Sequence, residues 1–84
     1  MTVKDLAKQL AELVADGQGD RVVVLSRDGE GNGFAELYDL DDNARFSACD
    51  GEVGPQRLTP EMKRQGFTSE DVKRSGKPAL VLWP

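Results

Sequence analysis

Residues 27–42 read RDGEGNGFAELYDLDD, and the arrangement of the whole chain depends on this stretch. Glycine occurs at the alternate positions Gly29, Gly31 and Gly33, six residues are acidic, and no basic residue follows Arg27. Alternating glycines lose much backbone entropy on folding and offer no side chains to pack, so neither a helix nor a regular strand suits residues 28–33. The stretch therefore predicts a shaped acidic loop.

A helix and a strand are predicted before this loop. Thr2 and Asp5 form a short capping box, and Gly17 is a natural helix stop. Between them, apolar residues recur at helical spacing, which predicts an amphipathic helix: Val3, Leu6, Ala7, Leu10, Leu13 and Val14. This stripe either binds a partner or packs on the protein's own sheet, and we favour the sheet. Residues 21–26 (RVVVLS) predict a strand that is central in its sheet or covered on both faces.

Less regular elements are predicted after the loop. Phe34, Leu37 and Leu40 are three residues apart, which indicates an irregular extended segment over 34–40, anchored by these side chains. Residues 39–43 are expected to form a turn, with Asp39, Asp41, Asp42 and Asn43 at its polar positions. Alternation over 45–49 indicates an edge or half-exposed strand. The glycines and proline in 50–58 predict a loop.

Two short helices and a final strand complete the prediction. Thr59-Pro60-Glu61 and Thr68-Ser69-Glu70-Asp71 are helix starts, with Met62, Phe67 and Val72 expected to point inward. The apolar run 79–83, which includes Trp83, predicts a buried strand beside 21–26. The expected fold is a single α+β domain over 1–84: an N-terminal helix packed on a mainly antiparallel sheet of three or four strands, with two short helices between 60 and 74 before the last strand.

Composition narrows the possible functions. The chain has 84 residues, no histidine and a single cysteine, Cys49, so the commonest general base is missing and no internal disulfide can form. Residues 1–42 carry ten acids and four bases, whereas residues 43–84 carry five acids and seven bases. An acidic chain with an isoelectric point near 4.7 repels phosphate backbones, which disfavours direct nucleic-acid binding. No membrane segment or secretion signal is recognisable, so we expect a cytoplasmic protein.

The acidic loop also resembles the opening of a calcium-binding loop. With Asp28 at position 1, Glu30, Asn32 and Asp39 stand at positions 3, 5 and 12, and Gly33 takes the bend. Hard oxygen ligands at alternate positions suit Ca²⁺. However, Glu30 is longer than the usual third ligand, Asp39 replaces a bidentate glutamate, and a strand precedes the loop instead of a helix. The alternative is a solvated acidic turn whose carboxylates cap backbone N–H groups.

Catalysis and phosphate binding are poorly supported. Ser26, Ser47 and Cys49 have no histidine to activate them as nucleophiles. The spacing of the loop glycines does not match a phosphate-binding loop, and Asp28 and Glu30 would repel the anion. We therefore predict that the chain is not an enzyme and has no cofactor, apart from the calcium alternative.

Four segments together resemble a family of small proteins from bacteriophages and prophage-bearing bacteria. They are MTVKDL, VVVLSRDGEGNGFAEL, LTPEMKRQGFTSEDV and KPALVLWP. The resemblance is weakest over 41–56 and carries no catalytic residues with it. It implies a small accessory protein in the cytoplasm of a bacterial host cell that modulates a host process or counters a host defence.

The sequence thus predicts an acidic, non-enzymatic accessory protein that binds a host protein. The expected contact residues lie in the acidic loop and in the segment that follows it: Asp28, Glu30, Asn32, Glu36, Tyr38, Asp39, Asp41 and Asp42. The alternative is a divalent-cation-binding domain that uses Asp28, Glu30, Asn32 and Asp39. A third possibility is a structural homodimer paired through a strand edge or the first helix, so the oligomeric state remains open between monomer and homodimer.

Overall fold

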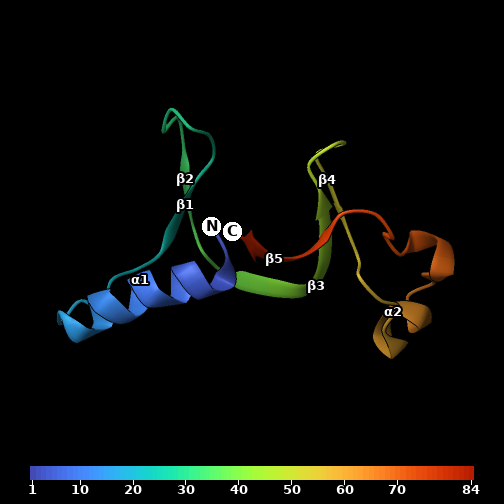
Figure 1. Ribbon diagram of the computed structural model, residues 1–84, viewed down its shortest axis with the longest axis horizontal. Helices are drawn as coiled ribbons and strands as arrows, with labels where there is room; N and C mark the ends of the chain where they lie inside the picture. Colours follow the sequence, from blue (N-terminus) through green and yellow to red (C-terminus); the bar gives the residue numbers. More distant parts are fainter. The chain divides into compact units, whose positions relative to one another are not determined.

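Two units make up the chain in the computed structural model, which describes residues 1–84 (Figure 1). Residues Met1–Tyr38 and Pro84 form the N-terminal unit, and Asp39–Trp83 form the C-terminal unit. The first holds one helix and a two-stranded antiparallel sheet; the second holds a three-stranded antiparallel sheet and two short helices. The predicted α+β class is confirmed, whereas a single domain over 1–84 stays a prediction. Neither α1 nor α2 has the length and apolar character needed to cross a membrane.

Helix α1 (Val3–Ala15) begins at the predicted capping box. The Asp5 carboxylate accepts a hydrogen bond from the Thr2 backbone N–H at 2.9 Å, and the Thr2 hydroxyl accepts one from the Asp5 N–H at 3.2 Å. These bonds satisfy backbone groups that have no partner inside the helix. No residue of α1 is buried, and Val3, Leu10, Leu13 and Val14 in its apolar stripe are exposed.

Strands β1 (Val24–Ser26) and β2 (Phe34–Glu36) form an antiparallel hairpin that carries the glycine-rich loop at its tip. Leu25 pairs with Ala35 in the register. Two further bonds extend the ladder: the Arg27 N–H donates to the Gly33 carbonyl at 2.8 Å, and the Leu37 N–H donates to the Val23 carbonyl at 2.8 Å. The strand predicted over 21–26 is therefore shorter and belongs to an exposed hairpin, so the prediction that it is covered on both faces is wrong.

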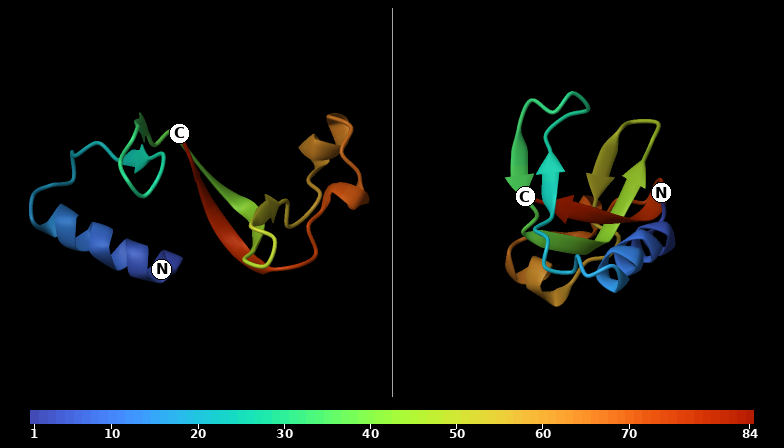
Figure 2. Two further views of the ribbon diagram at one scale, coloured as in Figure 1. Left: turned by 90° about the horizontal axis from the view of Figure 1, so that it is seen from above. Right: turned by 90° about the vertical axis from the view of Figure 1, so that its left-hand side faces the viewer.

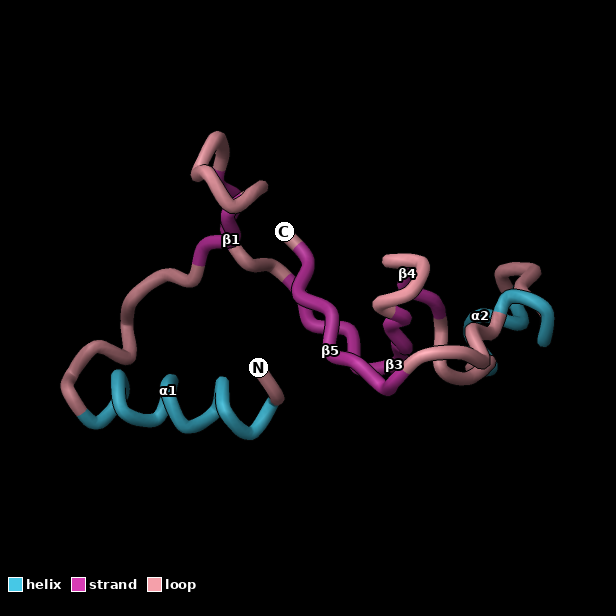
Figure 3. The backbone as a smooth tube through the Cα atoms, turned by 45° about the horizontal axis from the view of Figure 1, so that its top comes forward, coloured by secondary structure: helices cyan, strands magenta, loops and turns pink.

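The C-terminal unit is built on β3 (Asp39–Ser47), which lies between β4 (Glu52–Gly54) and β5 (Lys77–Trp83) in an antiparallel sheet. Strands β3 and β5 run side by side and twist around one another (Figures 2 and 3). The register slips between Asp41 and Ala44, because Asp42 and Asn43 oppose the single residue Leu80. This is a β-bulge, a feature that bends a strand and increases its twist. Accordingly, β3 bends along its length (Figure 1).

The bulge residue Asn43 fastens the loop after β4 to β3. Its side-chain oxygen accepts a hydrogen bond from the Arg57 N–H at 3.0 Å, and its side-chain amide donates to the Arg57 carbonyl at 3.1 Å. The amide of Asn43 thus pairs with both backbone groups of Arg57, as a neighbouring strand would. Ala44, beside the bulge, is the most buried apolar residue, at 1% exposure.

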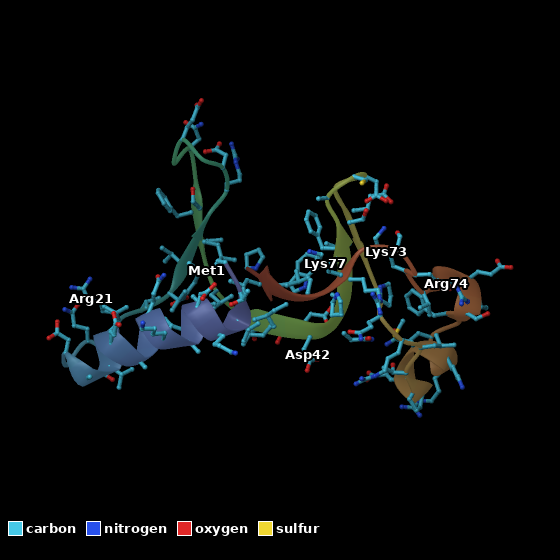
Figure 4. All side chains as sticks on the ribbon, viewed as in Figure 1. Met1, Arg21, Asp42, Lys73, Arg74 and Lys77 are labelled. Atoms are coloured by element: carbon cyan, nitrogen blue, oxygen red, sulfur yellow. The ribbon has the colours of Figure 1, made fainter.

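Helix α2 (Pro60–Arg64) and the 3-10 helix η1 (Ser69–Asp71) begin as predicted. The Thr59 hydroxyl caps α2, and Thr68 forms a capping box with Asp71. Lys73 then donates its backbone N–H to the Pro55 carbonyl at 2.8 Å, and its ammonium group lies 3.2 Å from Asp50 Oδ2 (Figure 4). These bonds bring the chain back to the sheet, where β5 begins.

Four other predictions were wrong in detail. Residues 39–43 are not a turn but the first half of β3, because β5 supplies the partner strand. The 50–58 loop contains the short strand β4. The final strand pairs with β3 and not with 21–26, and Trp83 is 51% exposed, not in the core. The segment 34–40 is split between β2 and β3, and its expected anchors Phe34 and Leu40 are exposed.

Candidate protein-binding surface

The hairpin loop is ordered by the carboxylate of Asp28. Its Oδ1 accepts hydrogen bonds from the backbone N–H groups of Glu30 at 2.9 Å and Asn32 at 3.2 Å, and its Oδ2 accepts one from the Asn32 side-chain amide at 3.0 Å. The same amide reaches Glu30 Oε2 at 3.4 Å. The hydrogen bonds from the Asn32 side chain and backbone, followed by that from the Glu30 N–H, lower the pKa of Asp28. The loop is therefore a closed turn with a fixed negative charge.

One face of the hairpin continues from this loop as an exposed apolar surface. Side chains alternate along a strand, so Phe34 and Glu36 share a face of β2, and the register places Val24 opposite Glu36. Tyr38 follows two residues after the end of β2. Phe34 is 67% exposed and Tyr38 is 89% exposed. The prediction that Phe34 anchors the segment inside the protein is wrong. The hairpin instead presents two aromatic rings together with its acids.

The remaining predicted contact residues lie on β3, in the C-terminal unit. Asp39 Oδ1 accepts a hydrogen bond from the Leu40 N–H at 2.8 Å, and Asp41 Oδ1 accepts one from the Asn43 N–H at 2.9 Å. Asp42 has no protein hydrogen-bond partner for its carboxylate, which projects outward from β3 (Figure 4). These acids therefore retain free oxygens that face outside the strand ladder.

None of the carboxylates from Asp28 to Asp42 forms an ion pair. The ion pair in the structure joins Lys73 and Asp50, which lie outside this segment. The structure groups Asp28, Glu30, Asn32, Glu36 and Tyr38 on the hairpin, and Asp39, Asp41 and Asp42 on β3. The acidic character expected from the sequence is thus left uncompensated on both units.

The four residues of the calcium alternative are not gathered into a site within one unit. Asp28, Glu30 and Asn32 are together in the hairpin loop, but Asp39 belongs to β3 in the other unit. No group of three or more His, Cys, Asp or Glu side chains is arranged to hold a metal ion. In addition, Asp28 Oδ1 already accepts two backbone N–H groups and Oδ2 accepts the Asn32 amide, so little of this carboxylate's hydrogen-bonding capacity is left for a cation. The loop geometry matches the alternative of an acidic turn that caps its own backbone.

A groove of about 330 Å³ in the C-terminal unit was not predicted. Its walls come from β3, β4, β5 and the α2 region, and they combine one carboxylate and the two amides of Asn43 and Gln65 with apolar and aromatic side chains. The residues that matter here are Asp41, Ala44, Met62, Phe67 and Trp83. The prediction that Phe67 points inward is wrong, because Phe67, like Trp83, is exposed although it lines the groove. The sequence also could not show that these residues meet Asp41, because that depends on how β5 pairs with β3.

Comparison with known proteins adds no further assignment: no protein-family model, curated protein or solved structure matches this chain.

Proposed function

We propose that this chain is a non-enzymatic accessory protein that acts by binding a basic surface of another protein. The observation that carries the proposal is the acidic segment 28–42, whose carboxylates have no basic partner in their own chain. Unpaired surface carboxylates complement a positively charged patch, and such complementarity increases the rate of association and excludes acidic partners.

The hairpin adds the apolar component that a stable interface needs. Phe34 and Tyr38 are exposed beside Glu36, and aromatic residues contribute strongly to the binding energy of interfaces. Because the bonds to Asp28 order the loop, little conformational entropy is lost when the hairpin binds a partner. An ordered acidic loop next to exposed rings supports a binding role.

The pKa shifts support a role other than catalysis. Accepted hydrogen bonds lower the pKa of each of the three carboxyl groups Asp5, Asp28 and Asp50. A general acid or base at neutral pH needs the opposite shift. The resemblance to phage and prophage proteins makes a bacterial host protein the expected partner, with host modulation or counter-defence as its consequence.

Charge reversal tests the proposal. Glu30, Glu36 and Asp42 are surface acids whose carboxylates accept no backbone hydrogen bond, so a triple change to lysine should leave the fold intact. We expect that the tagged triple variant no longer captures the protein that the unmodified chain captures from bacterial lysate, and that this protein has a basic surface.

The matched control changes Glu12, Glu61 and Glu70 to lysine. These three acids lie outside segment 28–42, and the control introduces the same change in net charge. Equal loss of capture in both variants would mean that net charge alone, and not the position of the acids, determines binding. Capture that survives in the first variant would refute the exposed acids Glu30, Glu36 and Asp42 as the contact surface.

A further inference from the structure

We propose that the groove lined by Asp41, Phe67 and Trp83 binds an arginine or lysine side chain of the partner protein. The inference rests on the proposed function and specifies the chemistry of the partner. It assigns a role to a feature of the C-terminal unit that the acidic segment alone does not explain.

The carboxylate of Asp41 is the polar group that selects a cation. It is partly buried, its Oδ1 is occupied by the Asn43 N–H, and its Oδ2 has no hydrogen-bond partner in the chain. No arginine or lysine of this protein lines the groove. A half-buried carboxylate without a counter-charge repels anions, and covering it with a neutral apolar group would remove its water without replacing the lost hydrogen bonds. A cationic hydrogen-bond donor supplies both the counter-charge and the hydrogen bond that the Asp41 carboxylate lacks.

The aromatic residues suit the same ligand. In the register Asp39 pairs with Trp83, and Asp41 pairs with Val81, so alternation places Asp39, Asp41 and Trp83 on one face of the sheet. Trp83 is 51% exposed and Phe67 is 43% exposed, although both line the groove. Tryptophan is the best aromatic partner for a cation, and apolar walls accommodate the methylene stem of a basic side chain.

The residues at the base of the groove are held in place by burial and hydrogen bonds. Ala44 lies at its floor with 1% exposure, and Asn43 is held by two hydrogen bonds to the Arg57 backbone. The volume of about 330 Å³ lies at the small end of the range for ligand sites, which suits one side chain and not a larger ligand. A single inserted arginine or lysine therefore agrees with the size, the charge and the lining.

The test uses the fluorescence of Trp83, the single tryptophan of the chain. The probes are N-acetyl-arginine amide and N-acetyl-lysine amide, with N-acetyl-citrulline amide as the uncharged control of similar shape. We expect a saturable change in fluorescence with the two cationic probes and none with the citrulline probe over the same concentrations. Equal responses to the arginine and citrulline probes would overturn the inference.

Two groove variants and one control locate the binding. Asp41→Asn keeps an oxygen that can accept the Asn43 N–H but loses the charge, and we expect it to weaken arginine-amide binding by about fivefold, the effect of one partly exposed ion pair. Glu52→Gln removes one charge from an exposed position of the same unit that neither lines the groove nor belongs to segment 28–42, and it should leave the affinity unchanged. Phe67→Leu is a second groove variant, which keeps apolar volume, removes the ring, and should also weaken binding. Unchanged affinity in both Asp41→Asn and Phe67→Leu would refute the groove as the site.

This experiment separates the inference from the proposed function. If neither cationic probe binds, but charge reversal at Glu30, Glu36 and Asp42 still abolishes capture, the inference fails and the proposed function stands. If the probes bind as expected and charge reversal leaves capture intact, the proposed function of segment 28–42 fails, whereas the groove remains a cation-binding site.

Discussion

Replacing Gly76 by alanine tests the close approach of the chain to β3 just before β5. Gly76 has φ +85°, in the left-handed region that L residues rarely adopt. A Cβ atom here would lie 2.6 Å from the Phe46 carbonyl carbon, 2.9 Å from the Ser47 nitrogen, and nearer still to the Phe46 oxygen. These are backbone atoms of β3, so no side-chain rotation relieves the overlap. The β5 backbone would have to move away from β3.

The expected cost follows from two contributions. A left-handed conformation costs a residue with a Cβ about 1–2 kcal/mol, and overpacking that requires a backbone shift costs about 1–3 kcal/mol. Their sum, about 2–5 kcal/mol, is a large part of the roughly 4–12 kcal/mol expected for a folded chain of 84 residues. The Gly76→Ala variant should therefore unfold at a much lower urea concentration than the unmodified chain.

Gly51→Ala is the matched control. Gly51 lies in the turn between β3 and β4 with φ +71°, but no atom lies within 4 Å of the position of its Cβ. It should therefore lose only the conformational contribution, about 1–2 kcal/mol. Urea unfolding, monitored by the fluorescence of Trp83, gives the free energy of unfolding of both variants, since Gly51, Gly76 and Trp83 all belong to the C-terminal unit. If Gly76→Ala is no less stable than Gly51→Ala, the contact between the Gly76 position and the β3 backbone is refuted.

Three further predictions follow from the hydrogen bonds of the two units. Asn43→Ala should lower the free energy of unfolding by about 1–3 kcal/mol, because both backbone groups of Arg57 lose their partner, and a cost below the error of urea unfolding would contradict that role. The hydrogen bond from the Thr2 backbone N–H is the chief reason that the pKa of Asp5 is lowered. The Asp5 carboxylate therefore contributes fully to the stability of α1 above its pKa in the unfolded chain, about 3.9, and this contribution is lost as the pH falls through its lower pKa in the folded chain. Circular dichroism at 222 nm should therefore show less helix in Asp5→Asn than in the unmodified chain at pH 7, with the difference disappearing at low pH; a constant difference would refute the capping role. Millimolar calcium should leave the melting temperature unchanged, because the hairpin loop brings only the carboxylates of Asp28 and Glu30 together and Asp39 belongs to the other unit, whereas a rise of several degrees would support the calcium alternative.

The helix starts were predictable because they depend on residues close together in sequence. Thr2 and Asp5 form the capping box within one turn of α1, and the Thr59 hydroxyl caps α2. Each signal is a side chain that accepts a neighbouring N–H, so no distant part of the chain is needed to form it. The acidic turn at Asp28 is local for the same reason.

Strand pairing was not predictable from local signals. Aspartate and asparagine are uncommon in strands, so residues 39–43 indicated a turn. The structure overrides this tendency because β5 pairs with Asp39, Leu40 and Asp41 across a long stretch of intervening sequence. The sequence likewise favoured an association between the two most apolar runs, 21–26 and 79–83, although a run of apolar residues does not specify its partner strand. The acids of the candidate surface were found from composition, whereas the groove was missed because it needs this pairing.

The β-bulge in β3 affects both the strand pairing and the groove. Its one extra residue determines which side chains of β3 face the groove. Ahead of the bulge, Asp41 shares a face with its β5 partner Val81. In a regular strand Ala44 would lie on the opposite face, three positions further on. The extra residue shifts the alternation, so that Ala44 pairs with Ala79 and returns to the face that carries Asp41. Because of this shift, the most buried residue of the chain becomes the floor beneath an unpaired carboxylate, and the two neighbouring acids take different roles: Asp41 lines the groove, and Asp42 faces outward.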